Sequence, residues 1–282
     1  MIGMELTHEN YFSLEADREY MSVHQFKAWT TCAEKEAARQ RGDYVPGQVD
    51  AFVFGHYVDC ALTTPDEFEA FCAENAGVIL NRKGEKYSDY RIADGMIARV
   101  QGDPDAVELL AGDCQAIVTG EIDGVQWKGA VDCLKLDCGI FTDLKTTRDF
   151  SPTWEAVVTE GFSRNVRVPW YGRYWAQMAV YRSLIEQQFG VVCEPVILGV
   201  SKHTRKDEAG ETRPSPGLVA VRFNDADCLD QEIALIRADL PQVMAWKTGD
   251  AIPPACGNVD ACDWCRERGK LKIWPAQRVY VG

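Results

Sequence analysis

The chain has 282 residues, of which 46% are hydrophobic and 26% charged, a composition typical of a soluble globular protein. It contains no run of about 18 apolar residues, which excludes a transmembrane helix, and its acidic N-terminus lacks the features of a secretory signal, so we expect a cytoplasmic protein. The net charge of −13 excludes a protein that coats nucleic acid non-specifically, but it allows an enzyme whose basic residues line one groove.

The first part of the chain is predicted to be helical. A helix is expected over 23–41, because Ser22 is a natural N-cap, Gln25 follows three residues later as in a capping box, and Gly42 offers a stop. Further helices are expected over 51–62, 65–75 and 88–101.

Beyond residue 114 the pattern changes. Segments rich in valine, isoleucine, threonine and aromatic residues predict strands over 115–122, 125–136 and 139–147. Asp123-Gly124, between the first two segments, is a strong hairpin signal. The remaining expected elements are a helix over 170–188, strands over 196–202 and 218–223, and a helix over 225–246.

This order of elements indicates an α/β fold with a central mixed sheet flanked by helices. The sequence shows no linker that would force a division, so we expect one domain over 1–282. Within it, a helical region covers about 20–110, and a cysteine-containing tail covers about 250–282.

Two carboxylates and a lysine lie on neighbouring predicted strands. Asp132 ends the apolar part of one strand, and a tight turn brings Asp143 back beside it. Residues two apart on a strand point to the same face, so Asp143 and Lys145 are expected to enter one pocket. Two such carboxylates make a hard-oxygen site for Mg²⁺ or Mn²⁺, and the lysine can hold an attacking water. An Asp-x-Lys by itself would be typical of a solvated hairpin.

The segment G-A-V-D…T-D-L-K-T-T around Asp132, Asp143 and Lys145 resembles the core motif of the PD-(D/E)xK nucleases, particularly the branch with RecB-type, lambda-type and RecE-type (exonuclease VIII) enzymes. Two flanking motifs resemble the same branch. His56 follows Phe-Gly on an upstream helix, and Q-M-A-V-Y, which ends in Tyr181, lies on a downstream helix. Each flanking motif alone has an ordinary structural explanation, but their joint order favours the family and a restriction-endonuclease-like core.

The resemblance implies specific roles for these residues. His56, Asp132 and Asp143 would bind the metal ion, while Gln177 and Tyr181 would belong to the catalytic group on the helix after the core. Glu121, on the neighbouring strand, is either a further carboxylate of the site or a solvated hairpin residue.

A cysteine group near the C-terminus has the spacing of a metal or iron–sulfur site. Its members are Cys256, Cys262 and Cys265, and Cys32 is the candidate fourth ligand. In RecB-like and CRISPR-associated nucleases that carry a [4Fe–4S] cluster, one ligand comes from this N-terminal helix and three from the C-terminus. This sequence reverses their usual order of short and long spacings, so a [4Fe–4S] cluster, zinc and unligated thiols all stay open.

DNA is the substrate that the resemblance implies. The stretch 161–185 contains no acidic residue, and a second basic stretch lies over 202–206. Basic residues expected to contact phosphates are Arg164, Arg167, Arg173 and Lys202. A solvated basic face is the ordinary explanation of such a pattern.

RecE-type and lambda-type relatives degrade linear duplex DNA from the 5′ end as ring-shaped oligomers and work with a single-strand annealing protein. We therefore expect a Mg²⁺- or Mn²⁺-dependent exodeoxyribonuclease of phage-type recombination, with such a recombinase as partner and a homo-oligomeric assembly. Two alternatives stay open: a RecB-like or CRISPR-associated iron–sulfur nuclease that acts on single strands, and an inactive DNA-binding scaffold.

Overall fold

The computed structural model describes residues 4–47, 50–159 and 162–269, and the side chains of 50 and 155–165 lie outside the description. The chain divides into two compact units. The sheet unit consists of Met1–Val23 and Gly47–Arg237, and the cysteine unit consists of His24–Pro46 and Ala238–Gly282.

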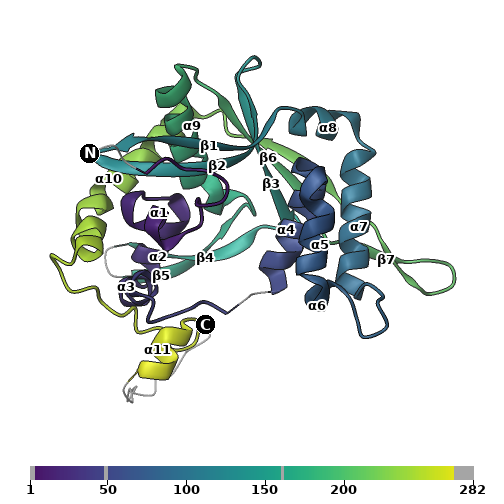
Figure 1. Cartoon of the computed structure of the whole chain (residues 1–282), viewed down its shortest axis with the longest axis horizontal. Helices are drawn as coiled ribbons and strands as arrows, with labels where there is room; N and C mark the ends of the chain where they lie inside the picture. Colours follow the sequence, from purple (N-terminus) through teal and green to yellow (C-terminus); the bar gives the residue numbers. More distant parts are fainter. Residues whose placement is uncertain (1–3, 48–49, 160–161, 270–282) are drawn as a thin grey trace, which may run out of the picture. The chain divides into compact units, whose positions relative to one another are not determined.

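The sheet unit is built on a five-stranded mixed sheet with the order β1-β2-β3-β6-β9 (Figure 1). Antiparallel pairing joins β1 to β2 and β2 to β3, whereas β6 runs parallel to β3 and antiparallel to β9. The strands are β1 (Asp113–Ile122), β2 (Val125–Lys135), β3 (Ile140–Thr147), β6 (Glu194–Ser201) and β9 (Leu218–Arg222). The predicted α/β fold with a central mixed sheet is therefore confirmed.

Helices pack against the strands of this sheet (Figure 1). The sheet unit contains α1 (Leu14–Glu19), α4 (Asp50–Thr63), α5 (Phe68–Glu74), α6 (Ala76–Ile79), α7 (Ser88–Gln101), α8 (Pro104–Leu110) and α9 (Trp175–Phe189), of which α4, α7, α8 and α9 contact the strands. α9 packs against β1 and β2, while α4 contacts β3 and α7 contacts β6. One buried apolar cluster packs α4 and α7 against the sheet. It includes Val58, Met96, Leu144 and Leu198.

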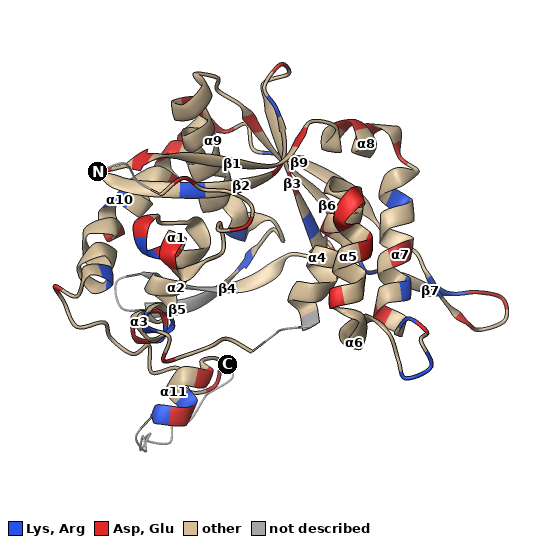
Figure 2. Ribbon diagram, viewed as in Figure 1, with Lys and Arg blue, Asp and Glu red and all other residues tan. Residues whose placement is uncertain are grey.

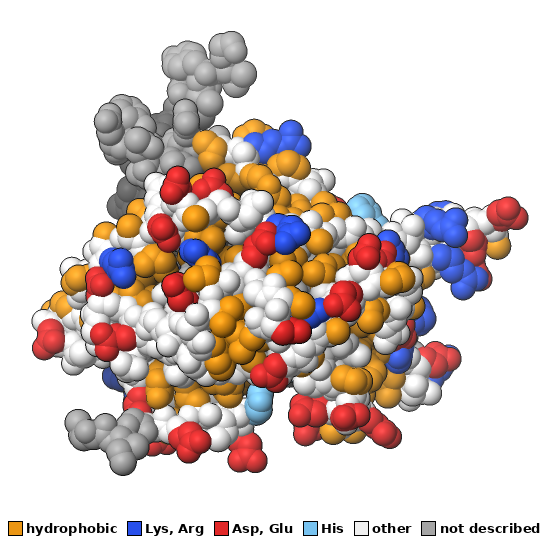
Figure 3. All heavy atoms as spheres, turned by 90° about the horizontal axis from the view of Figure 1, so that it is seen from above, with side chains coloured by type: hydrophobic (Ala, Val, Ile, Leu, Met, Phe, Trp, Pro, Cys, Tyr) orange, Lys and Arg blue, Asp and Glu red, His pale blue; other side chains and the backbone are white. Residues whose placement is uncertain are grey.

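Two hairpins occur in segments for which the sequence predicted no strand. They are formed by β4 (Thr153–Thr159) with β5 (Phe162–Val168), and by β7 (Thr204–Lys206) with β8 (Thr212–Pro214). Figure 2 marks basic residues in blue along the β7–β8 hairpin and acidic residues in red at its tip, and the space-filling view in Figure 3 shows these side chains on the projecting hairpin. Ion pairs of Arg213 with Asp207 and Glu211 offset part of this basic charge.

Several predicted helices have different limits in the structure. The helix predicted over 65–75 consists of a 3₁₀ turn, η1 (Pro65–Glu67), followed by α5. The helix predicted over 170–188 begins with a 3₁₀ turn, η2 (Gly172–Tyr174), before α9. Such 3₁₀ turns are common at helix ends.

The cysteine unit has helices from both ends of the chain. It holds all but the first residue of α2 (Val23–Thr31), α3 (Ala33–Arg41), the last part of α10 (Ala226–Thr248), and α11 (Asp263–Arg268). The helix predicted over 23–41 is two helices, because Cys32 has an extended backbone between α2 and α3. Along the described chain, no helix is both long and apolar enough to cross a membrane.

Candidate active site

Asp143 and Lys145 lie on β3, in the middle of the sheet. The side chain of Asp143 is 1% exposed, and its Oδ2 forms an ion pair with the Lys145 ammonium. This contact follows from the strand geometry, since residues two apart share a face. Burial by itself lowers the pKa of Lys145, but the carboxylates of Asp143 and Asp132 outweigh that effect and raise the pKa above its usual value. Lys145 is therefore a protonated ammonium at neutral pH.

Asp132 lies on β2 at the point where that strand separates from β3. The last residue pair of the ladder is Cys133–Thr142, so the next position would place Asp132 opposite Asp143. At this point a hydrogen bond from the backbone to a side chain follows the backbone ladder. The Asp132 Oδ2 accepts a 2.7 Å hydrogen bond from the Leu144 N–H. Burial, together with the negative charges of Asp143 and Asp59, raises the pKa of Asp132 well above its usual value.

α9 contributes Gln177 and Tyr181 to the same region. The Gln177 Nε2 donates a 2.7 Å hydrogen bond to Asp143 Oδ1, which orients the carboxylate. Tyr181 is buried one turn later and close enough to Asp143 and Asp132 that burial and these two charges raise its pKa. A side chain at Gly129 of β2 would place its Cβ 2.7 Å from the Tyr181 ring, so the glycine permits this close approach.

Asp59 of α4 is an additional carboxylate beside these residues, and the sequence did not indicate it. Its Oδ2 accepts a 3.2 Å hydrogen bond from Gln115 Nε2, which also donates to Thr63. Gln115 has a φ of 54°, in the left-handed region that non-glycine residues rarely adopt. Burial raises the pKa of Asp59, with His56 and Lys145 acting in the opposite direction and Asp143 adding to the rise.

His56 is exposed in the structure, and its ring stacks on Phe71 with 4.8 Å between the centroids.

A pattern in the sequence could have pointed to Asp59. Gly55, Asp59 and Thr63 recur every four residues and therefore line one side of the helix. Gly55 faces Thr146 of β3, which places that side of α4 toward the strand that carries the site.

The charges of this group fit a divalent cation. The Lys145 ammonium offsets one of the three negative charges of Asp59, Asp132 and Asp143, and a buried excess of negative charge is unfavourable without a counter-ion. Mg²⁺ and Mn²⁺ prefer carboxylate oxygens, so the donors fit them. The three carboxylates are less closely grouped than the cysteines described below, which in the described part of the chain are the only such set with ligand atoms all within 4.8 Å of one another.

Tyr174 connects Lys145 to a surface cation. The Lys145 ammonium lies 5.4 Å from the centroid of the Tyr174 ring, and the Arg173 guanidinium lies 5.0 Å from it. Arg173 also donates a 2.9 Å hydrogen bond to the Tyr174 hydroxyl. The Trp170 side chain is buried just upstream of the η2 turn. Its ring packs directly against Gly199 of β6, in the space that a side chain at that position would occupy. This packing holds the η2 turn beside Lys145.

The other predicted residues lie at different places. Glu121 is exposed near the β1–β2 turn and accepts a 3.3 Å hydrogen bond from Gln126. Arg167 is exposed on β5, and the Arg164 side chain lies outside the described residues. The Lys202 ammonium lies 3.4 Å from the centroid of the Phe54 ring at the end of β6.

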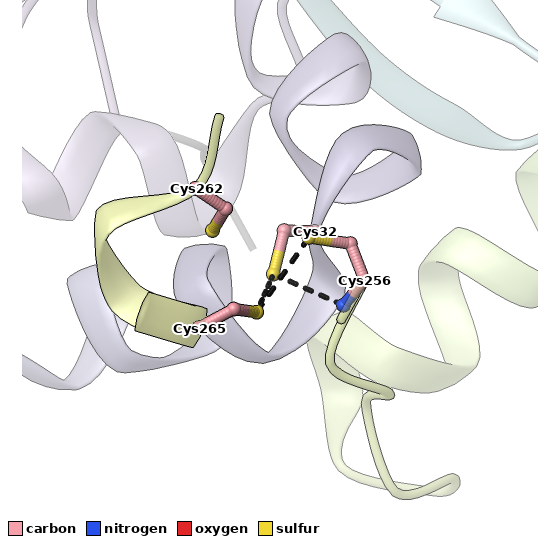
Figure 4. Close-up of side chains that lie close together, drawn as sticks. All are labelled: Cys32, Cys256, Cys262 and Cys265. Carbon is pink, nitrogen blue, oxygen red and sulfur yellow. Dashed lines mark hydrogen bonds between the residues drawn. The ribbon is translucent and has the colours of Figure 1, made fainter. Parts of the chain in front are cut away.

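The four cysteines converge within the cysteine unit (Figure 4). Their sulfur atoms all lie within 4.8 Å of one another, although Cys32 is more than 220 residues from the other three in sequence. Cys32, Cys262 and Cys265 are buried, and Cys256 is exposed. The four thiols therefore form a candidate metal site that involves none of the residues around Asp143.

Comparisons with known proteins identify the family and support the fold. Residues 22–267 match the family described as "PDDEXK-like domain of unknown function (DUF3799)". A crystal structure described as a "putative exonuclease" from Eubacterium rectale superposes with a TM-score of 0.80, at 26% sequence identity and with 97% of each chain covered. No curated protein matches the chain significantly. Because the family match spans nearly the whole chain, this protein belongs to that family of PDDEXK-like domains and so to the PD-(D/E)xK nuclease superfamily.

Proposed function

We propose that this protein is a metal-dependent nuclease that hydrolyses phosphodiester bonds of DNA. One observation carries the proposal: Asp132, Asp143 and Lys145 meet at the point where β2 and β3 separate, with Gln177 bonded to Asp143. An ordinary surface hairpin would leave such carboxylates solvated, whereas here they are packed together and raise the pKa values of their neighbours.

Each residue has a distinct part in this proposal. Asp132 and Asp143 bind the ion, and Asp59 supplies the helix ligand in place of His56. The bound ion would supply Lewis-acid activation of the phosphoryl group and of water. Lys145 positions the attacking water and offsets negative charge that develops on phosphorus. Gln177 keeps Asp143 oriented, as a hydrogen-bonded neighbour of a metal ligand does.

We further propose exodeoxyribonuclease activity on linear duplex DNA, in the 5′ to 3′ direction. The resemblance to RecE-type enzymes supports the substrate and the direction, and the neighbour described as a "putative exonuclease" supports exonuclease activity alone. A role in phage-type recombination, a single-strand annealing partner and a homo-oligomer follow from the same resemblance. The family match covers parts of both compact units, which supports one nuclease domain over the whole chain.

The direct experiment uses linear duplex DNA labelled at either end, with Mg²⁺ or Mn²⁺ and an EDTA control. We expect metal-dependent degradation that is absent in Lys145→Ala and retained in Lys135→Ala, a matched control on the neighbouring strand. The end that loses its label first gives the polarity. Failure to cleave duplex or single-stranded DNA with either metal would contradict the nuclease and favour the scaffold.

The choice between Asp59 and His56 needs a binding measurement. Mn²⁺ titration followed by electron paramagnetic resonance should show weakened binding in Asp59→Asn and unchanged binding in His56→Ala. Asp143→Asn serves as the positive control for loss of the ion. If His56→Ala loses Mn²⁺ while Asp59→Asn binds as well as the wild type, the assignment reverses and the nuclease proposal stands.

One second candidate is a nuclease of the RecB-like or CRISPR-associated kind that acts on single strands. The placement of the cysteines supports it, because one comes from the N-terminal helical region and three from the C-terminal segment, as in those enzymes, whichever metal they hold. The same assay with single-stranded DNA separates the two: a strong preference for single strands would support this candidate over the duplex exonuclease.

A further inference from the structure

The four cysteine sulfurs form a compact group. Two distances define it: Cys32 Sγ lies 3.8 Å from Cys265 Sγ, and Cys256 Sγ lies 3.6 Å from Cys265 Sγ. Cys262, at the start of α11, completes the set, and no pair of the four exceeds 4.8 Å (Figure 4).

These separations discriminate between kinds of metal site. In a tetrahedral zinc site each Zn–S bond is about 2.3 Å, and the edge of a tetrahedron is about 1.6 times that length, so the sulfurs stand roughly 3.8 Å apart. In a [4Fe–4S] cluster each cysteine binds a different iron at a separate corner of the cube, which spreads the four cysteine sulfurs well beyond single-ion distances. The observed 3.6 and 3.8 Å separations fit one ion and do not fit the cluster that the resemblance implied.

We propose that Cys32, Cys256, Cys262 and Cys265 bind a single zinc ion. Four thiolates leave no open position on the ion, which is the arrangement of a structural zinc site. The ion would join the α2–α3 break to the C-terminal segment within the cysteine unit, and it would neither exchange electrons nor bind substrate.

Backbone N–H groups donate to the sulfurs. The Cys256 N–H lies 3.4 Å from Cys32 Sγ. Backbone N–H groups of Asn258 and Gly257 also donate to Cys256 and Cys265, in a turn where Gly257 has a φ of 68°. Such donors stabilise negative charge on sulfur, as second-shell partners of metal ligands do.

A second set of contacts holds the same segments together. The Tyr44 hydroxyl donates a 2.6 Å hydrogen bond to Asp263 Oδ2, and Lys35 forms an ion pair with the same carboxylate. Trp264 packs edge-on against Tyr44 with 5.8 Å between the ring centroids. These contacts place α3 beside α11, so the four thiols are preorganised for one ion.

Metal analysis of the full-length protein, purified without oxygen, tests the proposal. We expect about one zinc per chain with negligible iron and acid-labile sulfide. Metal-free protein titrated with Co²⁺ should develop the visible absorption of tetrahedral cobalt bound by four thiolates. Cys262→Ser should lose the zinc, whereas Cys138→Ser, which changes an exposed cysteine outside the group, should retain it.

Three results would overturn the inference. Iron and sulfide in equal amounts at about four per chain would establish the cluster instead. Metal-free protein that gives no tetrahedral cobalt spectrum would show that the thiols are unligated. Zinc retained in both Cys262→Ser and Cys256→Ser would place the ion elsewhere. Since metal content and the cobalt spectrum are measured on the wild type, the test does not depend on the variants folding, and it is independent of nuclease activity.

Discussion

Gln177→Ala should reduce nuclease activity without unfolding the protein. The variant removes one 2.7 Å hydrogen bond from the Gln177 amide to the Asp143 carboxylate. A hydrogen bond to a charged group contributes about 1.5–3 kcal/mol, which corresponds to a loss of about 10- to 150-fold in metal affinity or rate. The loss should appear in the Mn²⁺ dissociation constant as well as in the rate at saturating metal, because the freed carboxylate rotates away from its binding geometry.

α9 offers a matched control for this variant. Gln187 lies ten residues further along the helix and bonds the Glu121 backbone at the exposed end of β1, with distances of 2.8 and 3.1 Å. Gln187→Ala should therefore leave metal affinity and cleavage rate within about twofold of the wild type. Circular dichroism melts would establish that both variants fold. Activity of Gln177→Ala equal to that of Gln187→Ala would refute the argument that the amide orients the carboxylate.

The remaining predictions concern stability and DNA binding. Burial and neighbouring charges raise the pKa of Asp132, so the stability of the metal-free protein should fall as pH rises through that raised pKa. Asp132→Asn should remove this decline and raise the melting temperature near pH 8, and a lower value than the wild type there would contradict it. Arg173→Ala should lower the slope of log binding constant against log salt by about one, as measured by DNA anisotropy with Ca²⁺. The helix-surface variant Arg99→Ala should keep that slope, and an equal effect in both would argue against a local phosphate contact. Gly199→Ala should destabilise the fold by about 1–3 kcal/mol, because the added Cβ would lie 2.6 Å from the Trp170 ring. Thermal melting tests this, and an unchanged melting temperature would show that the ring moves freely.

Strand prediction succeeded where residues of high strand propensity were bounded by clear turns. The meander β1–β2–β3 follows the valine- and threonine-rich segments with the Asp123-Gly124 turn between the first two. The β7–β8 hairpin was missed because each of its strands has only three residues, most of them polar. The β4–β5 hairpin has strands of seven residues, but polar residues interrupt their apolar pattern, so local pattern did not separate them from a loop. The break between α2 and α3 was missed because no glycine or proline marks Cys32.

The candidate site was predicted unevenly. Asp143 and Lys145 contact each other because a strand places residues two apart on one face, which can be deduced from the sequence. On α4 the sequence pointed to His56 as a metal ligand, and Asp59, three residues later on the same helix, was not among the predicted site residues. Which of the two approaches the carboxylates depends on how α4 rotates against β3, and that rotation is set by packing of residues distant in sequence.

The sequence by itself determined the chemistry of this protein: an α/β core, the Asp132–Asp143–Lys145 arrangement, and four cysteines with ligand spacing. These follow from local periodicity, from residue type, and from turns that act over a few residues. Only the tertiary structure decided that Asp59 lies beside these carboxylates, and that the four thiols stand close enough for one ion. Both depend on distances between segments far apart in the chain, and packing of the folded core sets these distances.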